Sequence, residues 1–304
     1  MRREHGQAAA LSVLFLTVLM LSAAAVIDVG SWMREDRDTQ RAADAADAAA
    51  LAGAQALPED QGTAQALALE YADENGGGVL AADVTFSTTV LPGDTINVDA
   101  DRPADSFFAK LVGIDSVEVG STAKARAGVP SEARWAAPIA VDEKHPLLNC
   151  SPVLKCFGSG NPTTLDMEKV GPGAFRLLNL DHSKGGTGSK ILSEWILEGY
   201  DGKMGPGQYN SDPGAKFNSS DVKAAMAERL ETEMLFPVYR TIREEGANLE
   251  YEVIGWVGFF VTGFEGKGNG GTVSGYFSRV IWEGTLDGTG GTTDFGVRSV
   301  ALID

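Results

Sequence analysis

Three adjacent residues, Asp181, His182 and Ser183, have the side-chain types of a hydrolytic triad. In such a site a serine attacks a carbonyl carbon, a histidine accepts the serine proton and a carboxylate orients the histidine. Adjacent positions in one loop do not provide the mutual geometry that these roles require. The only other histidines are His5, in the N-terminal tail, and His145. The sequence therefore predicts no catalytic residue and a protein without enzymatic activity.

Residues 287–294 read DGTGGTTD and carry oxygen atoms that could bind Ca²⁺. The run lacks the acidic spacing of a calcium-binding loop, so a turn between two strands explains it better. The chain's 37 glycines include no GxxxxGK[ST] motif, which excludes a phosphate-binding loop of that type. We therefore expect neither a metal nor a cofactor.

The two cysteines, Cys150 and Cys156, lie in a glycine-rich loop with five residues between them. Such a pair could close a small disulfide ring outside the reducing cytoplasm, and two free thiols are the alternative. A zinc site needs more ligands nearby, and only His145 is close.

Aromatic residues gather on two apolar segments, residues 251–264 and 273–286, which alternate like paired strands. They are Trp256, Phe259, Phe260, Phe264, Tyr276, Phe277 and Trp282. One set of these side chains would fill a core, and the other set could form an exposed binding strip. Core packing is the preferred interpretation.

The composition limits the partners. Of the 304 residues, 43% are hydrophobic and 22% are charged, which suits one or two soluble domains beside an anchor. The formal net charge is -17. Nucleic acids and anionic membrane surfaces are bound by clustered Lys and Arg, so we expect a solvated acidic surface and no nucleic-acid partner.

These segments follow an apolar N-terminus. Residues 8–27 carry no charge, and 20 helical residues span about 30 Å, the thickness of a bilayer's hydrocarbon core. The run predicts one transmembrane helix. A cleavable signal peptide ending near Ala25 is the alternative, although the run is longer than a typical signal h-region. Arg2 and Arg3 precede the run, but Arg34, Arg37 and Arg41 follow it, so counting basic residues alone does not decide the orientation. A short basic tail before an apolar run is typical of a signal anchor, from which we expect a cytoplasmic tail and an exported C-terminal part.

The helical pattern continues to residue 57 through an alanine-rich stretch. Its small side chains would let a neighbouring helix approach closely. This predicted packing face comprises Ala42, Ala45, Ala46, Ala49, Ala50 and Gly53. We expect it to contact either another protein or the module that follows in the chain.

The N-terminal segment resembles a known family. Glu4, Gly6 and Gln7 precede the apolar helix, Asp28 and Gly30 follow the uncharged run, and residues 40–54 read QRAADAADAAALAGA. This order is similar to the TadE/TadG-like family of minor pilin-like or pilus-assembly proteins of the tight-adherence (Flp) type IV pilus system.

The resemblance implies other pilin-like or Tad assembly proteins as partners and a single-pass location in the cell membrane. It also implies Gly6 and Gln7 as a place of processing. A prepilin-type site would carry Glu at position 11, where this chain has Leu11, so cleavage there stays open. The DxSxS metal motif of larger TadG proteins is incomplete, because Gly185 occupies its last position.

The predicted fold class is α+β. We expect a long transmembrane and alanine-rich helix over residues 1–57, a small αββαβ module over 58–128, a linker at 129–134 and a β-rich α+β domain over 135–304. In that last domain, apolar residues at every fourth position predict a helix over 221–236, which would carry Glu228, Glu231 and Glu233 on a solvated face.

Together these features predict a non-enzymatic component of a tight-adherence pilus or a related secretion system. It would act through helix packing and an exported domain. A membrane-anchored surface binding protein, or adhesin, is the alternative.

Overall fold

The computed structural model describes residues 4–75, 79–100, 102–119, 121–150, 156–167, 174–213, 216–245, 248–268, 270–286 and 292–303, without the side chains of 4–8 and 35–42 in the first helix. The chain forms two compact units. One comprises Met1–Arg126 with Ala301–Asp304, and the other comprises Ala127–Val300.

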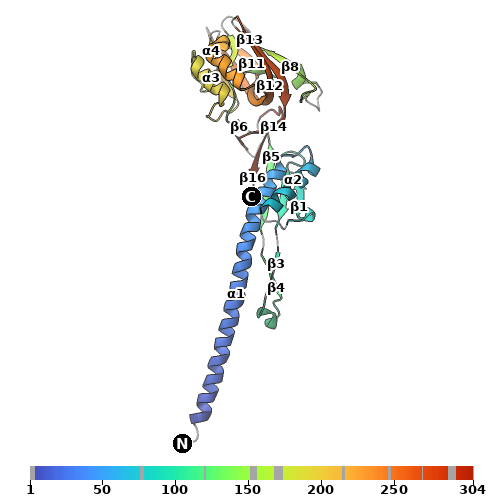
Figure 1. Ribbon diagram of the computed structural model, residues 1–304, viewed down its shortest axis with the longest axis vertical. Helices are drawn as coiled ribbons and strands as arrows, with labels where there is room; N and C mark the ends of the chain where they lie inside the picture. Colours follow the sequence, from blue (N-terminus) through green and yellow to red (C-terminus); the bar gives the residue numbers. More distant parts are fainter. Residues whose placement is uncertain are drawn as a thin grey trace. The chain divides into compact units, whose positions relative to one another are not determined.

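Two helices begin the first unit (Figure 1). Helix α1 (Glu4–Ala54) is continuous over 51 residues, which confirms the long N-terminal helix predicted from the sequence. Helix α2 (Gln61–Glu74) begins after Asp60, whose carboxylate accepts hydrogen bonds from the backbone N–H of Thr63 at 2.9 Å and from its hydroxyl at 2.7 Å.

A small antiparallel sheet follows these helices. The 3₁₀ turn η1 (Ala81–Asp83) precedes it, and its antiparallel strands are β1 (Val84–Ser87), β2 (Thr95–Asp99) and β5 (Thr122–Gly128). Val84 in β1 lies opposite Val98 in β2, and β2 pairs with β5. Near the end of the chain, the backbone N–H of Ile303 donates to the Lys124 carbonyl at 2.9 Å.

A second hairpin interrupts this sheet between β2 and β5. It consists of β3 (Arg102–Asp105), the short 3₁₀ turn η2 (Ala109–Val112) and β4 (Ser116–Val119). Gly113 ends the turn with a φ of 88°, a left-handed conformation that glycine adopts without strain. The sequence predicted a helix and one strand in this region, so the structure adds a strand pair to the predicted αββαβ order.

The second unit is built on a seven-stranded sheet. Its order is β7 (Val141–Asp142), β11 (Thr232–Glu245), β12 (Asn248–Lys267), β10 (Gly207–Pro213) and β9 (Ala174–Leu178), with β13 (Gly270–Ser278) pairing both β12 and β8 (Thr163–Asp166). The hairpin of β12 and β13 matches the predicted pairing of two long apolar strands. The α+β class is therefore confirmed.

Shorter elements complete this unit. They are β6 (Glu132–Ala133), η3 (Pro146–Leu148), α3 (Ser189–Leu197), η4 (Lys216–Asn218), α4 (Ser220–Glu228), β14 (Val280–Ile281), β15 (Gly284–Thr285) and β16 (Val297–Leu302). Strand β6 lies within residues 129–134, the segment predicted as a linker, and pairs with β15.

The predicted helix over residues 221–236 is wrong in its second half. Helix α4 ends at Glu228, and Thr232 begins β11, which pairs antiparallel with β12 from Val261 back to Asn248. Glu231 has a φ of 57° between the two elements. Sheet pairing satisfies the backbone and buries Phe236, which outweighs the local helical spacing. Glu228, Glu231 and Glu233 consequently do not share a helix face.

The aromatic residues of β12 and β13 form the core of the second unit. Phe259 and Phe277 are fully buried with their ring centroids 5.3 Å apart, and Trp256 is also buried. Phe260 and Tyr276 stack at 5.0 Å and are only partly buried. Core packing is therefore confirmed for Trp256, Phe259 and Phe277, whereas the outward-facing set is only partly buried.

Candidate membrane helix and its contacts

The apolar part of α1 is uncovered by the rest of the described chain. Its stretch Ala9–Arg34 is long and apolar enough to cross a bilayer, and none of its most apolar window is buried. Leu11, Leu14 and Phe15 each leave more than half of their side-chain surface exposed. An exposed stretch of this length must be covered by lipid or by other apolar helices, because water disfavours it.

The alanine-rich part of α1, by contrast, is buried inside the first unit. Ala45, Ala46, Ala49 and Ala50 have no exposed surface. The side chain of Ala42, the remaining alanine of the predicted packing face, lies outside the described residues.

Gly53 shows how closely the following module approaches this face. A Cβ atom at Gly53 would lie 2.5 Å from Cδ1 of Ile96 in β2, 2.7 Å from the Ala64 carbonyl oxygen and 3.2 Å from Cβ of Ala68 in α2. Of the two contacts that the sequence left open for this face, the described residues make the one with the following module.

Asp28 is the point where α1 holds the β3–β4 hairpin. Its carboxylate accepts hydrogen bonds from the backbone N–H groups of Phe107 at 2.9 Å, Phe108 at 3.0 Å and Ala109 at 2.6 Å. Only 4% of the residue's surface is exposed. Figure 1 shows the hairpin running along α1, with the connecting turn at its far end.

Sequence reasoning gave Asp28 no role beyond the family pattern. One available signal was its position, because it is the first charged residue after the uncharged run of residues 8–27. An acidic side chain beside a membrane span is expensive unless a specific partner satisfies it. The partner, however, lies about 80 residues away in the sequence and uses only backbone groups, so its identity was not predictable.

The triad-like residues do not form a triad. The Asp181 carboxylate accepts from the backbone N–H of Ser183 at 3.0 Å, and His182 Nδ1 donates to the carbonyl of Gln208 at 3.2 Å. The His182 ring stacks on Tyr209 at 4.2 Å. Burial raises the pKa of Tyr209 to about 12, and its hydroxyl donates to the Gly205 carbonyl. The Asp181 carboxylate, the His182 ring and the Tyr209 hydroxyl are therefore hydrogen-bonded to backbone groups.

The structure describes part of the DGTGGTTD run and both cysteines. Of residues 287–294, the first five positions lie outside the described residues, and the carboxylate of Asp294 accepts from the Arg298 guanidinium at 2.8 and 3.0 Å. Cys150 and Cys156 form a disulfide with their Cα atoms 6.0 Å apart. This confirms the disulfide and excludes the alternative of two free thiols.

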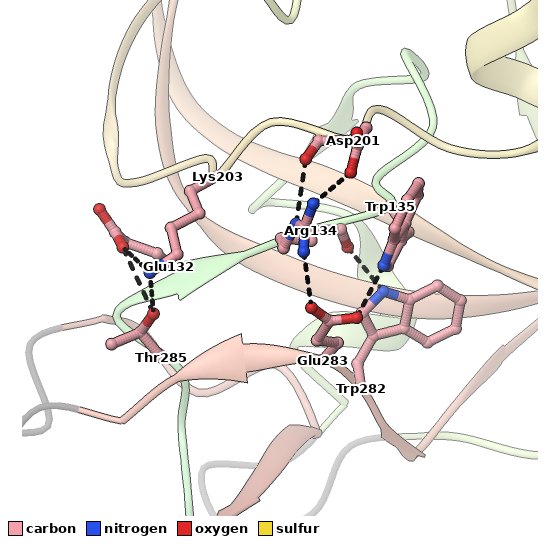
Figure 2. A network of polar contacts seen from close by, with 8 residues as sticks. All are labelled: Glu132, Arg134, Trp135, Asp201, Lys203, Trp282, Glu283 and Thr285. Atoms are coloured by element: carbon pink, nitrogen blue, oxygen red, sulfur yellow. Dashed lines mark hydrogen bonds and ion pairs between the residues drawn. The ribbon is translucent and has the colours of Figure 1, made fainter.

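A polar network joins strands β6 and β15 in the second unit (Figure 2). Arg134 donates to the carboxylates of Asp201 and Glu283, the second at 3.0 Å. Glu283 also accepts from the Trp135 indole at 2.8 Å. The Trp282 indole donates to the Arg134 carbonyl at 2.8 Å.

The charges in this network satisfy one another. Hydrogen bonds from Trp135 and then Arg134 lower the pKa of Glu283, and the bond to Glu283 raises the pKa of Arg134. At the other end of the network, the ammonium of Lys203 lies 3.7 Å from the Glu132 carboxylate. The network therefore holds residues 132–135 in place near the start of the second unit. The polar groups of the network form hydrogen bonds and ion pairs with one another.

Gly6 and Gln7, the predicted processing residues, lie in the first turns of α1, and the side chain of Gln7 is outside the described residues. Comparison of the chain with curated proteins and with solved structures finds no match. Residues 6–56, which cover nearly all of α1, match the family described as "Putative Flp pilus-assembly TadE/G-like", which confirms the family that the N-terminal sequence resembles.

Proposed function

We propose that this chain is a minor pilin-like, non-enzymatic component of Flp pilus assembly, held in the cell membrane by α1. One observation carries the proposal: the segment that matches the TadE/G-like family is also an exposed apolar helix of membrane-spanning length. Such a helix has a free surface in the plane of the membrane, where other pilin-like helices can pack against it.

The helix surface available to partners is the apolar stretch Ala9–Arg34, rather than the alanine-rich face. That face is occupied by α2 and β2 in the described structure. Partner contacts in this proposal therefore lie within or close to the bilayer.

We propose that the residues before the apolar stretch Ala9–Arg34 are cytoplasmic and that everything after this stretch is exported. The disulfide between Cys150 and Cys156 supports this direction, since such bonds persist in oxidising compartments. N-terminal sequencing of the protein from membranes separates an intact anchor beginning at Met1 from processing at Gln7 or removal of the span after Ala25.

Site-specific photo-crosslinking in cells tests the partner claim. A photoreactive residue at Leu14, which is 65% exposed in the span, should form adducts with the Flp pilin or with other Tad assembly proteins, identified by mass spectrometry. Leu80 is 68% exposed but lies outside the span, so the same residue there is the matched control. Adducts from neither position, or equal adducts from both, contradict packing through α1.

The alternative function, surface binding by residues 135–304, would rest on the outward-facing aromatic residues, of which Phe260 and Tyr276 stack on each other and are only partly buried. Trp256, Phe259 and Phe277 are buried in the core of the second unit. Adhesion therefore stays a prediction of the sequence and is not the function that we propose.

A further inference from the structure

The turn between β3 and β4 presents apolar side chains to its surroundings. Residues 106–115, called the hairpin tip here, include four large apolar residues with substantial exposure. These are Phe107 at 69%, Phe108 at 42%, Leu111 at 85% and Ile114 at 45%. Four such side chains on one ten-residue turn are a concentration of exposed apolar surface. On water-soluble domains, exposed apolar surface of this kind marks a contact with a membrane or another protein.

The tip has a defined shape. The backbone N–H of Ser106 donates to the Asp115 carbonyl at 3.0 Å, and the N–H of Ile114 donates to the Ala109 carbonyl at 3.1 Å. The three hydrogen bonds to Asp28 then fix the tip to one position along α1. Its apolar side chains are consequently held at a set distance from both ends of the span.

The tip is held at Asp28, which lies at the C-terminal boundary of the part of α1 predicted to lie in the hydrocarbon layer. Asp28 directly follows the uncharged residues 8–27, whose helical length of about 30 Å matches a hydrocarbon core. Trp32 lies one turn further along α1, and tryptophan is enriched at membrane interfaces. Val29 and Met33, also near Asp28, are exposed on α1, so apolar surface continues from the span toward the tip.

We propose that the hairpin tip inserts into the boundary between lipid headgroups and acyl chains of the bilayer that α1 spans. The inference rests on the proposed membrane anchoring and adds a second, non-helical lipid contact to it. The occupant is lipid because Asp28, which holds the tip, directly follows the uncharged run, and Val29 and Met33 near it on α1 are exposed. Lys110 suits this depth, since its long side chain can reach back to the headgroups.

The contact is apolar and does not conflict with the acidic net charge. A net charge of -17 disfavours adsorption to anionic surfaces, but burial of Phe107 and Leu111 in lipid depends on their area and not on charge. The tip would hold the hairpin against the bilayer and thereby restrict the tilt of α1 in the membrane.

Fluorescence quenching in vesicles tests the proposal. The full chain is reconstituted in phosphatidylcholine vesicles with an environment-sensitive fluorophore on a single new cysteine, while the native cysteines stay in their disulfide. L111C reports on the tip, L16C on the middle of the span, and L80C is the aqueous control. Quenchers are iodide in water and doxyl groups at shallow or deep positions of the acyl chains.

We expect iodide to quench L111C several-fold less than L80C, and shallow doxyl lipids to quench it more than deep ones. L16C should respond most strongly to deep doxyl lipids. An L111C response equal to that of L80C, with L16C still protected, overturns the tip contact and leaves the anchor intact. An L16C that is open to iodide overturns both the tip contact and the membrane anchoring.

Discussion

Asp94 holds the turn between β1 and β2 together by accepting hydrogen bonds from three backbone N–H groups. The donors are Thr89, Val90 and Leu91, at 2.8, 2.9 and 2.8 Å. The residue has no exposed surface. A buried acceptor of this kind costs more to remove than an exposed one, because its donors are left without partners.

We predict that Asp94→Ala lowers the free energy of unfolding of the first unit by about 2–4 kcal/mol, since several donors lose a charged acceptor. Chemical denaturation of the full chain in detergent measures this change. Asp99→Ala is the matched control, because the Asp99 carboxylate accepts one exposed hydrogen bond from Thr122. Equal destabilisation by both substitutions contradicts the role given to Asp94.

The stabilisation by Asp94 should depend on pH. Burial raises the pKa of Asp94, but the hydrogen bonds from Leu91, Thr89 and Val90 together lower it by more than burial raises it. The net pKa of Asp94 is therefore below its usual value. A lowered folded-state pKa gives stability that is complete above the unfolded pKa, about 3.9, and is lost as the pH falls through the folded value. The difference in unfolding free energy between the wild type and Asp94→Asn should shrink only below about pH 4.

At the scale of elements, the close contact of α1 with α2 and β2 depends on small residues. Gly53 leaves no room for a side chain, whereas a Cβ atom at Gly30 in the same helix would meet nothing within 4 Å. The two glycines therefore differ in packing alone, although both interrupt an otherwise alanine-rich or apolar helix.

We predict that Gly53→Val destabilises the first unit by about 1–3 kcal/mol through overpacking, although a side chain at this helical position would otherwise favour the helix. Gly30→Val should leave the unfolding midpoint nearly unchanged. Thermal unfolding of the two variants in detergent makes the comparison. A Gly53→Val protein as stable as the wild type would show that α2 does not pack on this face.

The elements that the sequence predicted well are those with a strong local pattern. Helix α1 follows from uninterrupted apolar and alanine-rich residues, and the β12–β13 hairpin follows from alternation around a glycine-rich turn. Strand β11 was missed because its first residues carry helical spacing, and its strand conformation depends on pairing with β12. Local periodicity contains no information about such a partner.

In the candidate site, too, the features with a local sequence pattern were predictable and those that depend on a distant partner were not. The exposed membrane span was predictable from composition, since an uncharged, mostly apolar run of 20 residues is typical of a transmembrane helix. The contact of Asp28 with the hairpin tip was not, because it joins a side chain to backbone N–H groups of a turn far along the chain. The division of the chain at residues 57 and 134 stays a prediction.

At the scale of the whole molecule, the proposal places the first residues of α1 and the second unit on opposite sides of a membrane. Thiol labelling in intact cells tests this topology. We predict that a membrane-impermeant maleimide labels Cys150 and Cys156 only after a membrane-impermeant reductant has opened their disulfide. Labelling that requires cell lysis would instead place the second unit in the cytoplasm.

A cysteine at Gln7, in a chain without the native pair, is the control for this experiment. It should react only after the membrane is permeabilised, because the proposed tail is cytoplasmic. Loss of this cysteine from the mature protein would indicate that the N-terminus is removed, which the same samples reveal by N-terminal sequencing.

The most direct test of the central claim is the count of Flp pili on cells that lack this chain, compared with cells complemented by the full chain or by a version without the span Ala9–Arg34. Electron microscopy, with Flp pilin measured in the sheared fraction, provides the readout. We predict loss of pili in the deletion strain and recovery only with the full chain. Unchanged piliation in the deletion strain, or equal recovery by the version without the span, would contradict a membrane-anchored role in pilus assembly.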